Sequence, residues 1–97
     1  MNTVFKYPFA IADRVTIALP RWAMILHVDC QDGVPCLWAL VNTDQPDHDH
    51  DFRIYGTGHG IDKEMAINGK HVATFQQGSL VWHMFQERSL RSIHDAL

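Results

Sequence analysis

The sequence lacks any apolar run near the roughly 20 residues of a membrane-spanning helix. Its first ten residues, MNTVFKYPFA, also lack a charged start followed by a long apolar core. We therefore expect neither a membrane span nor a secretory signal. Cysteine is scarce, with only Cys30 and Cys36 in 97 residues, too few for a disulfide scaffold. These absences predict a protein of the reducing cytoplasm.

Basic residues are few as well. Eight Lys and Arg residues stand against eleven Asp and Glu, and the formal net charge is -3. Proteins that grip nucleic acid through its phosphates normally carry a basic face, so this composition disfavours that class of partner. A nucleic-acid-binding small barrel stays as an alternative, because a local basic patch is compatible with an acidic total.

Catalytic and cofactor signatures are also missing. There is no G-x-S-x-G, no Cys-His signature and no phosphate-binding loop with its lysine. We therefore expect no enzymatic activity and no cofactor.

What is present is the composition of a globular domain, with 46% hydrophobic and 20% charged residues. A chain this short makes one domain and buries only about 60–65% of its unfolded surface. Association with a second copy would cover more apolar surface, so we expect a homodimer.

The chain is organised around residues 23–57, where three apolar runs are separated by two turn signals. We predict a three-stranded antiparallel meander there. Its middle run, CLWALV, is apolar on both faces, which is typical of a central strand. On the first run, period two puts Met24, Leu26, Val28 and Cys30 on one face.

Short runs with period two or continuous apolarity, bounded by turn residues, predict seven strands: 3–9, 15–19, 23–30, 36–41, 52–55, 70–76 and 79–86. Pro8 places the first at a sheet edge, and residues 61–69 form a connection with a helical turn. Leu90, Ile93 and Leu97 recur on one helix face, and Ser89 caps that helix. The prediction is an all-β domain, a small antiparallel barrel or sandwich over 1–86, with a short helical tail over 87–97.

The Asp32-Gly33 turn between the two cysteines is a strong reversal signal. Cys30 and Cys36 are then either two buried thiols or, if they face each other across the hairpin, a cross-strand disulfide.

Residues 47–51 read DHDHD and are expected to form a solvated loop or hairpin tip. On an extended segment His48 and His50 project to the same side, which makes them weak candidate ligands for zinc or nickel. The following GTGHG, residues 56–60, is either a tight strand exit braced by His59 or an anion-binding loop.

The stretches PCLWALV, FRIYGTGHGI and LVWHMF, with Lys6-Tyr7 and the IALP of residues 17–20, resemble a family of small uncharacterised proteins of bacteriophages and prophages. The resemblance covers roughly residues 4–85. It implies a domain of unknown function in a phage context, working in the host cytoplasm, and it transfers no catalytic residue. It also marks residues 47–51 as a local feature and the tail after Phe85 as an addition.

The many large rings in strands that are apolar on both sides favour a protein that acts by binding another protein. With the phage resemblance, the expected role is an accessory protein that regulates or inhibits a host factor, including a defence system. The candidate binding residues are Trp38, Arg53, Tyr55, His59, Trp82, His83 and Phe85.

Overall fold

The structure, a computed structural model, describes residues 1–87 and consists of seven strands and one short helix. In chain order these are β1 (Asn2–Pro8), β2 (Arg14–Pro20), β3 (Met24–Gln31), β4 (Val34–Asn42), β5 (Asp47–Gly56), α1 (Lys63–Asn68), β6 (Lys70–Gln77) and β7 (Leu80–Gln86). The predicted tail helix, with Ser89, Leu90, Ile93 and Leu97, lies outside the described residues. The all-β prediction is confirmed.

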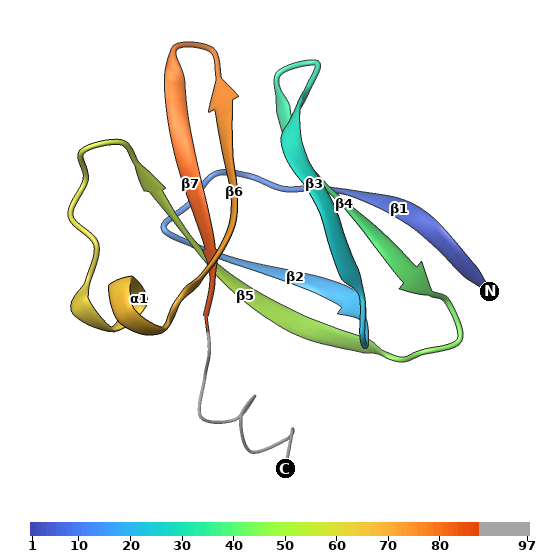
Figure 1. The fold of residues 1–97 in the computed structure, drawn as a ribbon. Helices are drawn as coiled ribbons and strands as arrows, with labels where there is room; N and C mark the ends of the chain where they lie inside the picture. Colours follow the sequence, from blue (N-terminus) through green and yellow to red (C-terminus); the bar gives the residue numbers. More distant parts are fainter. Residues whose placement is uncertain (88–97) are drawn as a thin grey trace.

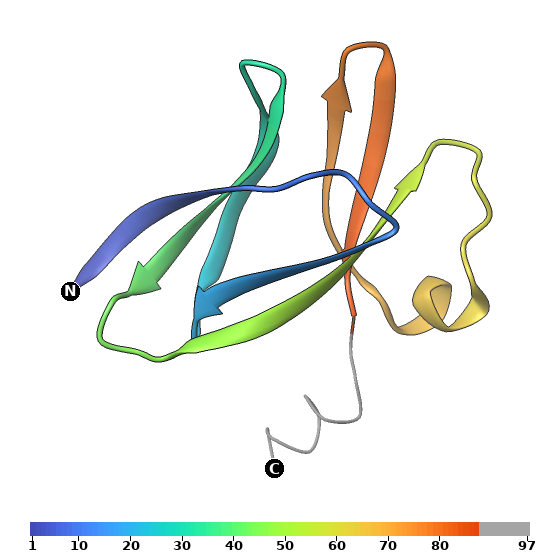
Figure 2. The same ribbon diagram turned by 180° about the vertical axis from the view of Figure 1, so that it is seen from behind.

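The strands form two antiparallel sheets, a three-stranded sheet in the order β1-β4-β3 and a four-stranded sheet in the order β2-β5-β7-β6 (Figure 1). The edge strands β3 and β6 lie close together, so the two sheets meet along that margin. Within the described residues the ladder is not closed into a barrel, because β3 and β6 are not hydrogen-bonded neighbours. β1 and β2 are the remaining edge strands, and both views show β1 running to the outer margin of the molecule (Figure 2).

One hydrophobic core lies between the sheets. Leu37 of β4, Phe52 of β5 and Met84 of β7 are completely buried and belong to the same cluster. Each side chain lies on the inner face of its strand, since side chains alternate between the two faces of a sheet.

The expected meander over residues 23–57 is wrong in its third strand. β3 and β4 form the predicted hairpin, and β4 is the centre of its sheet. β5, however, pairs with β2 and β7 in the other sheet. The β4–β5 connection therefore crosses from one sheet to the other, which the polar residues 42–46 do not reveal.

Two β-bulges change which side chains of a strand share a face of the sheet. The register between β3 and β4 slips between Ile25 and His27, so Met24 and Val28 point to opposite faces, and the prediction that they share a face is wrong. A similar shift in β6 lies between His71 and Ala73.

The cysteines do not pair. Cys30 lies opposite Pro35, and Cys36 lies opposite Asp29, so the two thiols point to different faces of the hairpin. Both are free; Cys36 is buried and Cys30 is partly buried. A cross-strand disulfide is therefore excluded by the geometry.

Candidate functional site

Four of the seven candidate binding residues gather on the outer face of the four-stranded sheet. Arg53 lies opposite Phe85, and Tyr55 lies opposite His83, in the β5–β7 register. The rings of Tyr55 and Phe85 meet edge to face with centroids 5.9 Å apart, and the Arg53 guanidinium lies 5.8 Å from the Tyr55 ring. The alternation of β5 and β7 produces this cluster, because directly opposed residues share a face.

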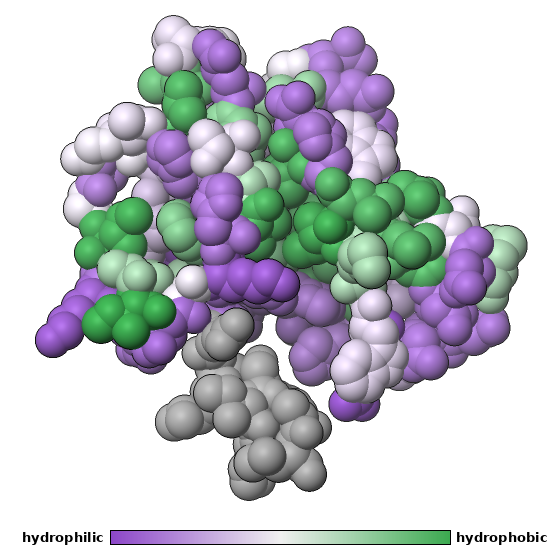
Figure 3. Space-filling model, in the orientation of Figure 1, coloured by the Kyte–Doolittle hydropathy of each residue, from purple (hydrophilic) through white to green (hydrophobic). Residues whose placement is uncertain are grey.

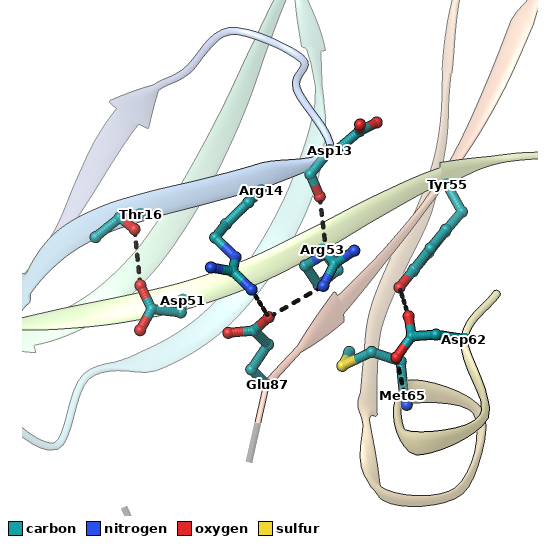
Figure 4. Close-up of polar contacts among 9 residues, drawn as sticks. All are labelled: Asp13, Arg14, Thr16, Asp51, Arg53, Tyr55, Asp62, Met65 and Glu87. Atoms are coloured by element: carbon teal, nitrogen blue, oxygen red, sulfur yellow. Dashed lines mark hydrogen bonds and ion pairs between the residues drawn. The ribbon is translucent and has the colours of Figure 1, made fainter. Parts of the chain in front are cut away.

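Two arginines converge on one carboxylate at the edge of this cluster (Figure 4). Arg14 Nη2 and Arg53 Nη1 lie 3.4 and 3.5 Å from the same Glu87 oxygen, and Arg53 Nε donates to the Asp13 carbonyl at 3.2 Å. A shallow pocket of about 230 Å³ opens here. Its lining includes three further carboxylates or amides beside the arginines: Asp62, Glu64 and Asn68, with Met65, Gly69 and Glu87. Since a carboxylate of the chain already faces both guanidinium groups, the pocket is not a free phosphate site.

Tyr55 connects the outer face of the four-stranded sheet to α1 through a hydrogen bond. Its hydroxyl donates to Asp62 Oδ1 at 2.9 Å, and Asp62 Oδ2 accepts from the Met65 amide at 3.3 Å, which caps the start of α1. The Tyr55 hydrogen bond lowers the pKa of Asp62, and burial raises the pKa of the Tyr55 phenol. Both groups are engaged in holding α1 against the sheet.

His83 lies between two threonine hydroxyls. Its Nε2 is 2.8 Å from Thr57 Oγ1, and its Nδ1 is 3.0 Å from Thr74 Oγ1. Thr74 Oγ1 is also 3.0 Å from His71 Nε2, which extends the chain of hydrogen bonds across β6 and β7. Both ring nitrogens of His83 are thus occupied, and this arrangement orients the ring.

The other three candidates lie elsewhere. Trp38 is on the outer face of the three-stranded sheet, with its ring 5.7 Å from that of His27. Trp82 faces the core side, and its Nε1 donates to Gln77 Oε1 at 3.2 Å. His59 folds back over Gly56, where a Cβ would come within 2.8 Å of its ring. His59 therefore braces the exit of β5, as the first of the two alternatives for the GTGHG segment expects.

The DHDHD segment is not a loop. It is the first half of β5, paired with β2 from Asp47 opposite Pro20 to Asp51 opposite Thr16. The register puts His48 and His50 on the face shared with buried Leu19 and Ile17, and the three aspartates on the outer face. The expectation of a loop or hairpin tip is wrong, because the period-two alternation D-H-D-H-D is that of a strand with two different faces. The expected exposure to solvent holds for every residue of the segment except His50, which is partly buried.

The two imidazoles do lie on one side, with ring centroids 5.5 Å apart. His50 Nδ1 is 3.3 Å from Gln86 Nε2, while its Nε2 is buried without a hydrogen-bond partner. Burial, then the neighbouring His48, lowers the pKa of His50. Across residues 1–87, no three His, Cys, Asp or Glu side chains come together in a way that could hold a metal ion. The pair therefore offers two ligands, short of the four of a structural zinc site.

A second surface escaped the sequence-based prediction. The three-stranded sheet carries six exposed large apolar side chains on its strands: Val4, Phe5, Met24, Leu26, Val34 and Leu40. Of this sheet, the candidate binding residues include only Trp38. The signal was present in CLWALV, whose even-numbered residues are apolar, but period alone does not tell whether a second face is covered.

A comparison with protein families identifies the chain. The family described as a domain of unknown function (DUF7352) matches residues 1–94. The chain belongs to this family. Neither the curated proteins nor the solved structures yield a match. The description of the DUF7352 family states no activity. A function for this member is therefore inferred from the residues on its surface. No helix among the described residues is long and apolar enough to cross a membrane.

Proposed function

We propose that this DUF7352 protein acts by binding another protein through the outer face of its three-stranded sheet. The observation that carries the proposal is the concentration of exposed apolar side chains on this sheet. Val4, Met24 and Leu40 lie on its outer face, whereas Phe5 lies opposite Ala39 on the core side. The strands of the four-stranded sheet expose only Leu80 among their large apolar residues. Monomeric soluble domains rarely expose contiguous apolar patches, and where they do, the patch commonly marks an interaction site.

The residues of this face form cross-strand rows. Val4, Leu40 and Met24 lie opposite one another on β1, β4 and β3, with exposed fractions of 49%, 39% and 59%. Figure 3 shows apolar surface gathered over β4 and β1. Because three strands contribute to one row, the row forms a continuous apolar strip across the sheet.

The adjacent row is amphipathic. Lys6, Trp38 and His27 lie opposite one another, and Lys6 Nζ donates to Gln31 Oε1 at 2.7 Å. A large ring beside an apolar strip, with charged groups around it, is the composition of a protein–protein interface, whose centre is apolar and whose rim is polar. Tryptophan is enriched among the residues that dominate binding energy.

The resemblance to phage and prophage proteins supports the biological setting. We place the protein in the host cytoplasm as an accessory factor that regulates or inhibits a host protein, such as a defence component. An apolar recognition face fits inhibition by occupancy of a partner's surface.

The test uses two matched substitutions. Leu40→Asp puts a charge at the centre of the strip, while Leu80→Asp puts the same charge at an exposed leucine of the other sheet. Host proteins captured from a lysate by the wild type are purified, and their affinity for each variant is measured by calorimetry. We expect Leu40→Asp to weaken binding at least tenfold and Leu80→Asp to leave it unchanged. Equal binding by the wild type and Leu40→Asp would refute the assignment of this face.

A further inference from the structure

The edge strand β1 has an open side whose hydrogen-bonding groups can be assigned residue by residue. Thr43 N donates to the Met1 carbonyl at 2.8 Å, and Phe9 N donates to the Pro35 carbonyl at 2.9 Å. Both contacts follow the β1–β4 register, in which Phe5 lies opposite Ala39. In an antiparallel pair, every second residue exchanges both of its backbone bonds with the partner strand. The odd-numbered residues of β1 therefore turn their N–H and C=O groups toward β4.

The even-numbered residues turn theirs away from the sheet. Asn2, Val4 and Lys6 each present an N–H and a C=O to the open side, while Pro8 presents a C=O and has no N–H to leave unpaired. β1 pairs with no described strand other than β4. The result is a row of three donors and four acceptors along one edge, which is a template for another strand.

Soluble proteins usually protect such an edge with charges, bulges or covering elements. β1 has no bulge and only one charged residue. Its pairing with β4 runs without a shift from Asn2 to Pro8, whereas the β3–β4 and β6–β7 ladders both contain one. Lys6 is its only charge, and Val4 and Phe5 are 49% and 43% exposed on opposite faces of the strand.

The other open edge is built differently. β2 buries Val15, Ile17 and Leu19, and exposes Arg14, Thr16 and Ala18. It therefore exposes backbone groups but no large apolar side chains. Of these two open edges, β1 alone combines unpaired backbone groups with exposed large apolar side chains.

We propose that β1 pairs antiparallel with β1 of a second copy of this chain, joining two three-stranded sheets into one six-stranded sheet. The choice of a second copy rests on self-complementarity. Hydrogen-bonded pairs on the open side must join even-numbered residues. With Phe5 opposite Phe5 of the second copy on the two-fold axis, Val4 lies opposite Lys6, and Thr3 lies opposite Tyr7.

This register is favourable for Phe5 and for Lys6. It puts two half-exposed aromatic rings against each other, and aromatic cross-strand pairs are favourable. It also keeps the two Lys6 ammonium groups apart. A register centred on Val4 keeps them apart too, whereas one centred on Lys6 places them directly opposite, which is unfavourable. Two-fold pairing of identical surfaces is the commonest form of association in soluble homo-oligomers.

The pairing makes a prediction that does not depend on the host partner. Val4→Pro removes an outward N–H that both permitted registers use, and it removes no bond to β4. The matched control is Ala18→Pro. In the β2–β5 ladder the bonds of Arg21 to Pro46 and of Ile54 to Asp13 assign the odd-numbered residues to β5, so the Ala18 N–H also points outward.

The measurement is sedimentation equilibrium of the full chain over a wide concentration range. We expect the wild type and Ala18→Pro to dimerise, and Val4→Pro to dimerise at least tenfold more weakly because each dimer loses two hydrogen bonds. Circular dichroism checks that each variant is folded. A wild type that is monomeric throughout, or a Val4→Pro dimer as tight as the wild type, would overturn the proposal.

A second measurement covers the case in which Val4→Pro does not fold. Phe5→Cys places two thiols opposite each other at the two-fold axis, and mild oxidation should produce covalent dimers. Under the same conditions Ala18→Cys and the wild type, with its own two cysteines, should remain largely uncrosslinked. If Phe5→Cys crosslinks no better than Ala18→Cys, β1 does not pair with itself in this register. The dimerisation of Leu40→Asp is measured in the same way. If this variant still dimerises but no longer binds the host protein, host binding through the outer face and dimerisation through β1 are separate properties.

Discussion

At the scale of single residues, His50 is the most unusual side chain of the fold. It occupies the inner face of β5 opposite buried Ile17, yet its Nε2 is buried and has no hydrogen-bond partner. A buried polar atom without a partner costs about 1–3 kcal/mol. Asp49 and Asp51, its neighbours in sequence, point to the opposite face and raise its pKa less than burial and His48 lower it.

This environment predicts a pH dependence of stability. Since the pKa of His50 in the folded state lies below its ordinary value of 6.5, folding favours the neutral ring. The contribution of His50 to stability is complete above pH 6.5 and is lost as the pH falls through the lowered folded-state pKa. We expect His50→Leu to lose less stability than the wild type between pH 7 and pH 5, measured by urea unfolding at each pH.

The control for this experiment is His27→Leu, which removes an imidazole from an exposed position on the other sheet. That variant should not show the reduced loss of stability expected for His50→Leu, because the imidazole it removes is exposed and lies 3.7 Å from the Asp29 carboxylate. At pH 7, His50→Leu should remain within about 1 kcal/mol of the wild type, because the lost contact to Gln86 and the removed unpaired nitrogen act in opposite directions. An unchanged pH dependence in His50→Leu would show that the neutral ring is not favoured by the fold.

At the scale of elements, the β3–β4 hairpin depends on its two turn residues. Gln31 and Val34 are the last pair of the ladder, and both Asp32 and Gly33 have positive φ, 53° and 80°. This is the pattern of a type I′ turn, in which glycine is preferred. We expect Gly33→Ala to lower the free energy of unfolding by about 1–2 kcal/mol, the cost of the left-handed region for an L residue, as measured by urea unfolding.

Gly60→Ala is the matched control. Gly60 has open space around it, and its φ lies outside the left-handed region. The same methyl group should therefore leave stability unchanged or raise it slightly, because it restricts the unfolded chain. A similar loss in both variants would mean that backbone strain at the hairpin is not the cause.

The elements were largely predictable from the sequence, and their partners were not. Alternation and turn residues located the strands, and Asp32-Gly33 fixed the β3–β4 hairpin. Strand pairing between distant segments leaves no local trace, so the transfer of β5 to the second sheet was missed. Likewise the bulge near Leu26 inserts one residue into β3 and moves Met24 to the opposite face of the sheet. No residue type in this strand indicates the bulge from the sequence.

In the candidate site, too, the face of each residue within its strand was predictable, and the contacts between strands were not. Because alternation determines which residues of one strand share a face, the sequence places Arg53 with Tyr55, and His83 with Phe85, on the same face of their strands. That these two pairs meet depends on the β5–β7 register, and that Trp82 faces inward depends on which side the core occupies. Exposure of the Val4–Leu40–Met24 strip is a property of the whole arrangement, since it requires that nothing among the described residues cover that sheet.

At the scale of the whole molecule, the two sheets share one core and present different outer surfaces. The three-stranded sheet carries the apolar Val4–Leu40–Met24 strip on its outer face, whereas the four-stranded sheet carries Asp47, Asp49 and Asp51 in a row along β5. Thr16 donates to Asp51 at 2.7 Å, and the two nearby arginines face Glu87. Within residues 1–87, neither of these outer faces therefore carries the uninterrupted basic surface that phosphate binding needs.

This charge distribution disfavours the nucleic-acid alternative and predicts that the protein does not bind an oligonucleotide. At 50 mM salt, a fluorescent single-stranded oligonucleotide should show no saturable binding to the protein at concentrations up to about 100 μM, because non-specific binding comes almost entirely from phosphate neutralisation by basic residues. Replacing the three aspartates of β5 by asparagine, which removes three negative charges, should at most introduce weak binding that disappears as salt rises. Tight binding by the wild type with a steep salt dependence would contradict both the charge argument and the assignment of the aromatic residues to protein contacts.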